Sequence, residues 1–229
     1  MKVGIIGDVH GNPRALESVL GCLDDAEIIY NLGDMVGIGP RPWEAVEMIR
    51  KDGRIRSVMG NHCHNTVHGT QLGPTDVVPR KPHHDWVRDQ LDRDQMRYLK
   101  GLPIHLEEDI EGVRISVMHR HPDDCGSRVP YFDDPTPGVL DDFYDGVEGD
   151  LILFGHTHVP LDVHGGRRYF NPGAVGVQNG GKASFGILEV ENGGFDLERR
   201  EVKYDSAAVA DEIMERGIPY RKFIVKTFF

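Results

Sequence analysis

The chain opens on Lys2-Val3-Gly4-Ile5-Ile6-Gly7-Asp8-Val9-His10-Gly11-Asn12-Pro13. Residues 2–6 form an apolar run that is typical of a buried strand. A carboxylate, Asp8, and an imidazole, His10, follow directly past its end. Asn12 is a good helix cap, and Pro13 suits the first position of a helix. This stretch predicts a strand, a sharp turn that carries metal-binding side chains, and a helix.

Four further apolar runs end in the same kind of polar motif. They are residues 28–30 before Gly33-Asp34, 55–59 before Gly60-Asn61-His62, 113–118 before His119, and 151–154 before Gly155-His156-Thr157-His158. Groups just past strand carboxyl ends converge on one crevice in an α/β architecture. Asp, Asn and His bind borderline transition metals through oxygen and nitrogen, and a carboxylate can bridge two cations. Each motif begins with a glycine or a strand end, and glycine permits sharp turns with positive φ angles. The set predicts a two-metal site.

The remaining pattern indicates α and β layers in one domain, residues 1–229. The first half alternates strand and helix, and the second half is rich in strands. Further strands are predicted at 159–164, 167–170, 183–190 and 194–202, and helices from Pro13, from Pro42, at 85–99 and at 205–216. Residues 63–84 and 120–137 are predicted as long loops, and residues 223–229 as a final strand or tail.

Composition narrows the functional classes. The net charge of −11 works against non-specific binding to nucleic acid, which needs a basic face. No apolar run is long enough to span a bilayer, and the N-terminus begins with a strand and not a signal peptide. The three cysteines, Cys22, Cys63 and Cys125, match no disulfide or zinc framework. We therefore expect a cytoplasmic protein.

The ordered motifs D-x-H, G-D, G-N-H, H and G-H-x-H resemble those of the calcineurin-like metallophosphoesterases, in particular the small bacterial and archaeal phosphodiesterases. The segments 33–40 and 171–176 match that branch as well. The resemblance implies a four-layer αββα sandwich with two mixed sheets flanked by helices. It also implies an enzyme that hydrolyses phosphoester bonds of a small substrate, as a phosphodiesterase or phosphatase.

The resemblance also implies the roles of single residues. One cation would be held by Asp8, His10, Asp34 and His158, and the second by Asp34, Asn61, His119 and His156, so that Asp34 bridges the two. A hydroxide bound between the metals would be the nucleophile, and His62, as imidazolium, would protonate the leaving group. The ligands suit Mn, Fe, Ni, Co or Zn.

Two positions depart from the family pattern. Cys63 stands where an acidic residue usually orients the catalytic histidine, and a small buried thiol is the favoured interpretation. His119-Arg120-His121 stands where the family has His-Gly, so that His121 competes with His119 as the ligand. Arg120 could contact phosphate or lie solvated in its loop.

Other functions stay open at this point. A non-catalytic binding or scaffold module of the same fold is one, and a nuclease or dinucleoside polyphosphate hydrolase is another. The sequence leaves the substrate, the metal and the oligomeric state undetermined. We expect specificity to lie in loops 63–84 and 120–137. The histidines of the first loop, His83 and His84 among them, are expected to be solvated more readily than to form a lid.

Overall fold

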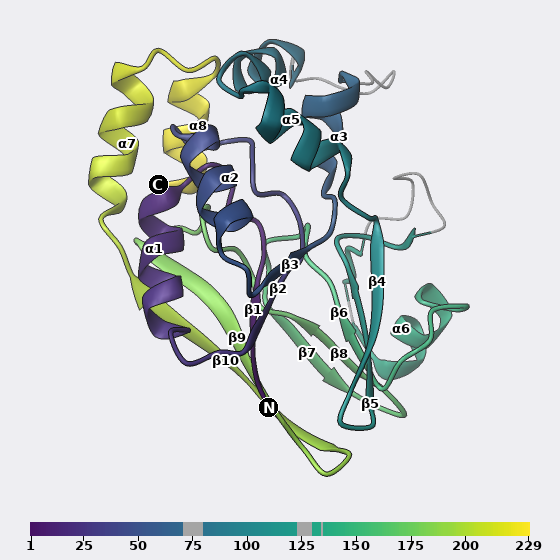
Figure 1. Cartoon of the computed structure of the whole chain (residues 1–229). Coiled ribbons are helices and arrows are strands. Elements are labelled where there is room, and N and C mark those ends of the chain that lie inside the picture. The colour runs from purple at the N-terminus through teal and green to yellow at the C-terminus, as the bar shows by residue number, and fades with distance from the viewer. Residues whose placement is uncertain (71–79, 123–129, 134) are drawn as a thin grey trace.

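Two five-stranded mixed sheets lie face to face, with helices on their outer sides (Figure 1). The computed structural model describes residues 1–70, 80–122, 130–133 and 135–229. The architecture confirms the predicted four-layer αββα sandwich. Among the described residues, no helix has the length and apolar content that crossing a membrane would require.

The first sheet has the order β10-β9-β1-β2-β3. It consists of β1 (Lys2–Ile6), β2 (Ile28–Asn31), β3 (Ile55–Ser57), β9 (Lys182–Glu191) and β10 (Gly194–Lys203). Strands β1, β2 and β3 are parallel, and they are joined by α1 (Pro13–Cys22) and α2 (Pro42–Lys51). The predicted βαβαβ opening is therefore confirmed, and the carboxyl ends of these three strands share one edge.

The second sheet has the order β4-β5-β6-β8-β7, and β5, β6 and β8 run parallel. It consists of β4 (His105–Ile110), β5 (Val113–Met118), β6 (Leu151–Leu153), β7 (Leu161–His164) and β8 (Arg168–Asn171). One helix, α6 (Pro137–Phe143), covers its outer face in Figure 1. The others gather around the first sheet: α3 (Asn61–His68), α4 (Arg80–Asp89), α5 (Arg93–Lys100), α7 (Ser206–Glu215) and α8 (Arg221–Phe228).

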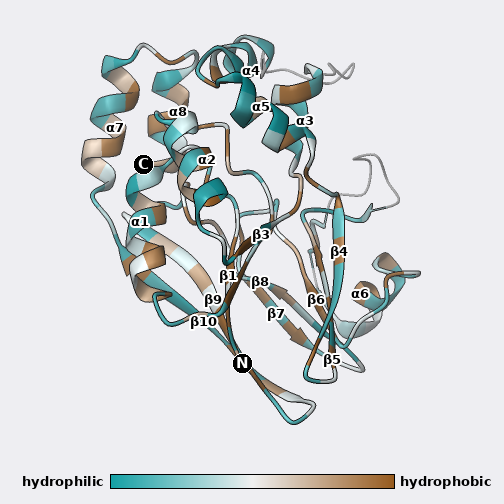
Figure 2. Ribbon diagram, viewed as in Figure 1, coloured by the Kyte–Doolittle hydropathy of each residue, from teal (hydrophilic) through white to brown (hydrophobic). Residues whose placement is uncertain are grey.

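The alternation of side chains along β1 explains how the layers hold together. Val3 and Ile5 are buried between the two sheets, against residues such as Val117, whereas Ile6 packs on the helix side with Leu16 of α1. In Figure 2 hydrophobic colour marks the central strands, while the helices carry long hydrophilic stretches. The start of α1 is also as predicted, because the Asn12 side chain accepts a hydrogen bond from the Ala15 amide at 3.1 Å.

The structure corrects two predictions. Residues 63–84 are not a long loop, since α3 and the start of α4 lie there, and residues 71–79 are outside the described part. The predicted loop 120–137 agrees with the structure where the chain is described, because no strand or α-helix lies between Arg120 and Pro137, the first residue of α6; residues 123–129 and 134 are outside the description. The C-terminal segment is a helix, α8, because the apolar side chains Tyr220, Ile224 and Phe228 recur every four residues and face one side.

Gly176 packs against the first motif of the chain, residues 7–12. Its amide donates to the Asp8 carbonyl at 3.0 Å, and a Cβ on Gly176 would lie 1.8 Å from the Val9 oxygen. Any side chain here must therefore displace the turn that carries Asp8 and His10.

We predict that Gly176→Ala lowers the free energy of unfolding by about 2–3 kcal/mol, because an overpacked backbone contact has to be relieved. The matched control is Gly166→Ala, since a Cβ on Gly166 meets nothing within 4 Å. Urea denaturation followed by circular dichroism measures both. Equal midpoints for the two variants would contradict the packing argument.

Candidate metal centre

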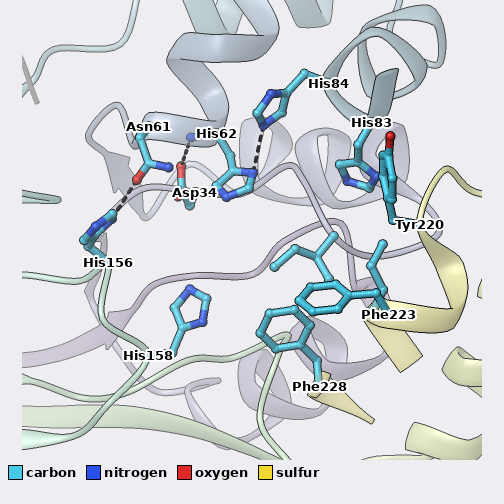
Figure 3. Close-up of a pocket in the computed structure, with 12 residues that line it drawn as sticks. Asp34, Asn61, His62, His83, His84, His156, His158, Tyr220, Phe223 and Phe228 are labelled. Carbon is cyan, nitrogen blue, oxygen red and sulfur yellow. Dashed lines mark hydrogen bonds between the residues drawn. The ribbon is translucent and has the colours of Figure 1, made fainter. Parts of the chain in front are cut away.

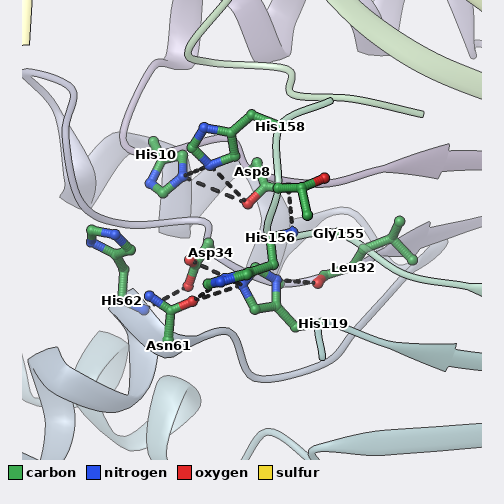
Figure 4. A network of polar contacts seen from close by, with 12 residues as sticks. Asp8, His10, Leu32, Asp34, Asn61, His62, His119, Gly155, His156 and His158 are labelled. Carbon is green, nitrogen blue, oxygen red and sulfur yellow. Dashed lines mark hydrogen bonds and ion pairs between the residues drawn. The ribbon is translucent and has the colours of Figure 1, made fainter. Parts of the chain in front are cut away.

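The side chains named as metal ligands converge at one end of the two sheets (Figure 4). They come from the turns after five strands, β1, β2, β3, β5 and β6. The structure brings all of them together: Asp8, His10, Asp34, Asn61, His119, His156 and His158. The sheet edge predicted from sequence is therefore where these side chains meet.

Five of these residues adopt the left-handed backbone conformation that non-glycine residues rarely enter. Their φ angles lie between 49° and 76°, and the residues are Asp8, His10, Asp34, His156 and His158. Hydrogen bonds hold the turns in place: the Asp8 amide donates to Gly33 O at 3.0 Å and the His10 amide to Asp34 O at 2.9 Å. Such local strain is a common property of functional sites.

The glycines before the ligands act mainly through close approach, which differs from the prediction. Of the four, only Gly33 has a positive φ. Gly60 instead lets the chain pass Asp34, since a Cβ on Gly60 would lie 2.1 Å from Asp34 Oδ1. The ligands, and not these glycines, take up the strained conformation.

One group of ligands consists of Asp8, His10 and His158. Asp8 Oδ1 is buried and lies 3.6 Å from His10 Nε2 and 3.4 Å from His158 Nε2, and those two nitrogens are 2.9 Å apart. His10 Nδ1 faces the Val36 carbonyl at 3.3 Å, so its N–H donates there and Nε2 keeps its lone pair.

The second group consists of Asp34, His119 and His156, with Asn61 between the two rings. His119 Nδ1 donates to Leu32 O at 2.8 Å, which leaves Nε2 as a lone pair 3.2 Å from Asp34 Oδ2. Asn61 Oδ1 lies 3.0 Å from His119 Nε2 and 2.7 Å from His156 Nδ1. Asp34 also shares a third group with His10 and His62, so it stands between the two sides of the site.

These atoms fit metal cations. Lone pairs of oxygen and nitrogen point at one another, and no hydrogen-bond donor among the described residues reaches the buried Asp8 Oδ1. Burial disfavours the charged form of Asp34, but positive charge on His119 and His62 when these rings are protonated outweighs it and lowers the pKa of Asp34. A metal cation beside the neutral rings would supply positive charge in the same place. Buried carboxylate charge surrounded by acceptors is stabilised by a divalent cation.

The structure distinguishes the two histidines of the fourth motif. His119 reaches Asp34, whereas His121 is buried in an aromatic cluster, stacked on Tyr144 with ring centroids 6.0 Å apart. The positive charge of Arg120 helps to lower the pKa of His156, after burial and the charge of His119. Arg120 therefore carries its charge close to the site.

Cys63 is fully buried in the core between the first sheet and its helices. Burial raises the pKa of its thiol to about 12, so the thiol stays protonated at neutral pH. This agrees with the interpretation of Cys63 as a small buried thiol. It also means that Cys63 cannot orient His62 by charge.

Two rings in the described part of the chain contact His62: His10, edge to face with centroids 4.9 Å apart, and His84, a residue for which sequence reasoning expected solvation. His84 is 1% exposed, its Nε2 lies 3.2 Å from His62 Nδ1, and its Nδ1 lies 2.8 Å from Thr70 Oγ1. Figure 3 shows His84 on α4 reaching down to His62. The adjacent His83-His84 pair in a polar segment was the only signal for this contact in the sequence.

Burial lowers the pKa of His62 well below its usual value, and the charge of Asp34 opposes this only in part. This lowered pKa favours the neutral imidazole of His62, whereas the resemblance implied the imidazolium form.

Comparisons with known proteins agree with this geometry. The family model described as the calcineurin-like phosphoesterase superfamily domain matches residues 1–193. The chain is 30% identical to an uncharacterised protein of Methanocaldococcus jannaschii, over 95% of this chain and 93% of that protein. It is also 30% identical to a crystallised metallophosphoesterase from Sphaerobacter thermophilus, with a TM-score of 0.77 and coverage of 99% of this chain and 97% of that one.

A more distant relative is a symmetrical bis(5'-nucleosyl)-tetraphosphatase of Paracidovorax citrulli. It is 30% identical over 52% of this chain and 44% of that protein.

We predict that Mn²⁺ raises the melting temperature of the metal-stripped protein, because a ligand that binds only the folded state stabilises it by mass action. Asp34→Asn should lose most of this response, since the side chain shared by two ligand groups loses its charge. Asp196→Asn, which changes an exposed carboxylate on β10, is the control and should respond as the wild type does. Differential scanning fluorimetry with and without Mn²⁺ measures the shift. An unchanged response in Asp34→Asn would contradict the assignment.

Proposed function

The chain belongs to the calcineurin-like phosphoesterase superfamily, and on that basis we propose that it hydrolyses phosphoester bonds with two bound divalent cations. The observation that carries the proposal is the convergence of acceptor atoms around Asp34 and Asp8. Asp8, His10, Asp34 and His158 would hold one cation, and Asp34, Asn61, His119 and His156 the other. Mn, Fe, Ni, Co and Zn all suit this ligand set.

Two cations at this site would supply positive charge for the phosphoryl oxygens and would acidify a water at neutral pH. The protein supplies the rest. Asp34 Oδ1 accepts the His62 amide at 2.7 Å, which fixes the start of α3 and therefore the position of the His62 ring. His156 is held in turn by its amide, which donates to Asp8 Oδ2 at 3.0 Å.

His62 would serve as the proton donor to the leaving oxygen, and His84 would position it. Two sets of tautomers satisfy these two contacts. With a neutral His62, Thr70 Oγ1 donates to His84 Nδ1 and His84 Nε2–H donates to His62 Nδ1. When His62 is the imidazolium, its Nδ1–H donates to His84 Nε2, His84 Nδ1–H donates to Thr70 Oγ1, and Nε2–H of His62 is the proton that it would give to the leaving oxygen, which returns the ring to its neutral form.

The relative from Paracidovorax citrulli makes hydrolysis of dinucleoside polyphosphates a second candidate function. A scaffold role without catalysis is less consistent with these residues, because the complete ligand set is present and its acceptors converge.

We predict that the Mn²⁺-loaded protein hydrolyses bis-p-nitrophenyl phosphate and that Asp34→Asn lowers kcat by about a hundredfold or more, as loss of a group that stabilises developing charge does. Asp196→Asn should retain wild-type turnover. Release of p-nitrophenolate measures the rate, and the metal content of each variant is measured alongside. Absence of turnover with Mn, Fe, Ni, Co and Zn alike would refute the hydrolytic proposal.

We predict that His84→Ala slows the hydrolysis of diphenyl phosphate about 10- to 100-fold while hydrolysis of bis-p-nitrophenyl phosphate changes little. Proton donation matters most for the poorer leaving group, and general acids contribute about 10²–10⁴-fold. His84→Gln keeps an amide that can either donate to or accept from His62 Nδ1, and it should recover part of the lost kcat. An equal loss on both esters, or a loss seen in KM alone, would mean that His84 only supports the fold.

A further inference from the structure

A cavity of about 350 Å³ adjoins the metal centre (Figure 3). One side is polar and includes Asp34, Asn61 and His62. The opposite side, here called the apolar wall, is lined by Ile38, Tyr220, Phe223, Ile224 and Phe228. Four of these five residues belong to α8 or its first cap, which lie beyond the residues 1–193 that the family model matches. Most of the apolar wall is therefore built by a segment that the family model does not include, whereas the candidate metal ligands all lie within residues 1–193.

The aromatic residues of the wall are placed for contact with a ligand. Phe223 is 54% exposed although it borders a cavity, and exposed apolar side chains of this size at a concave site indicate binding. Tyr220 adopts φ of 67°, an outlier for a bulky residue, and begins α8 in that conformation. This strained turn directs the chain from Pro219 back across the cavity.

His83 provides a polar atom next to the wall. It is 7% exposed and lines the cavity, and Figure 3 shows it beside Tyr220. Burial lowers the pKa of His83 to about 4, so the ring is neutral. Its Nδ1 lies 3.4 Å from Pro219 O and donates there, while Nε2 has no hydrogen-bond partner among the described residues. That nitrogen is an acceptor that lacks a donor, a condition that buried polar groups usually avoid.

We propose that the cavity binds the nucleobase of a nucleotide substrate, with the ring against Phe223 and Phe228 and an N–H group of the base donating to His83 Nε2. This inference rests on the proposed function for the position of the phosphate, which would lie on the metal side of the same cavity. An alkyl chain would cover the wall but leave His83 Nε2 unpaired, whereas a base offers a flat apolar face and a donor at its edge. The volume is at the small end of ligand pockets and suits one nucleoside.

The test compares ligands that share a phosphate and differ in the base. Calorimetry on the Mn²⁺-loaded protein measures the Kd of AMP, GMP, CMP, UMP and ribose 5-phosphate, with the methylene phosphonate replacing any ligand that is turned over. At least one nucleotide should bind about 10-fold or more tightly than ribose 5-phosphate, as base–aromatic stacking provides. Nucleotides that all bind within threefold of ribose 5-phosphate, or that do not bind, would overturn the inference.

Variants locate the effect. Phe223→Ala should bring the Kd of the preferred nucleotide close to that of ribose 5-phosphate and leave the latter unchanged, and His83→Phe should weaken the nucleotide alone. Tyr131→Ala removes another exposed aromatic residue, 74% exposed, and is the matched control. A base preference that survives in both Phe223→Ala and Phe228→Ala would refute the assignment to the wall.

The two proposals fail in different ways. A base preference without turnover of any ester would retain the nucleobase site and refute hydrolysis. Turnover of bis-p-nitrophenyl phosphate without a base preference would do the reverse.

Discussion

The burial of two carboxylates, Asp8 and Asp34, at the edge where both sheets end is the constraint on which the rest of the structure depends. Isolated buried charge is costly, so the fold must place compensating groups around it. The turns after five strands meet at this point, and five candidate ligand residues adopt a strained φ there. Glycine is required at positions 60 and 176, because a Cβ there would collide with Asp34 or with the Val9 carbonyl of the neighbouring turn.

Much of this arrangement follows from local sequence. Strand β1, the cap at Asn12 and the parallel order of β1, β2 and β3 were all predictable, because the apolar period and the turn residues agree with the tertiary fold. The convergence of the candidate ligands was predictable for a related reason. Each of these residues stands in the turn that follows a strand, so the topology alone brings them together.

The regions that were mispredicted depend on contacts distant in sequence. Helix α3 contains three histidines and three other polar residues in its eight positions, so only its packing through Cys63 and Thr66 indicates where it lies. Helix α8 does have a helical period, yet its short aromatic run also suits a strand. The partnership of His84 with His62 joins α4 to α3, and neither helix shows in its own sequence that the two rings meet.

The absence of a negative charge at position 63 and the contact of His84 with His62 are related. In the family pattern a carboxylate follows the catalytic histidine, and such a group would favour an imidazolium. In this chain the corresponding side chain is a protonated thiol turned into the core, and the contact to His62 comes from a second imidazole. A third carboxylate would add negative charge to a site that already buries the carboxylates Asp8 and Asp34. In the proposed mechanism, the contacts from Thr70 through His84 would orient the same ring without a further negative charge. The cysteine at position 63 is therefore compatible with the proposed role of His62, provided that α4 keeps His84 in place.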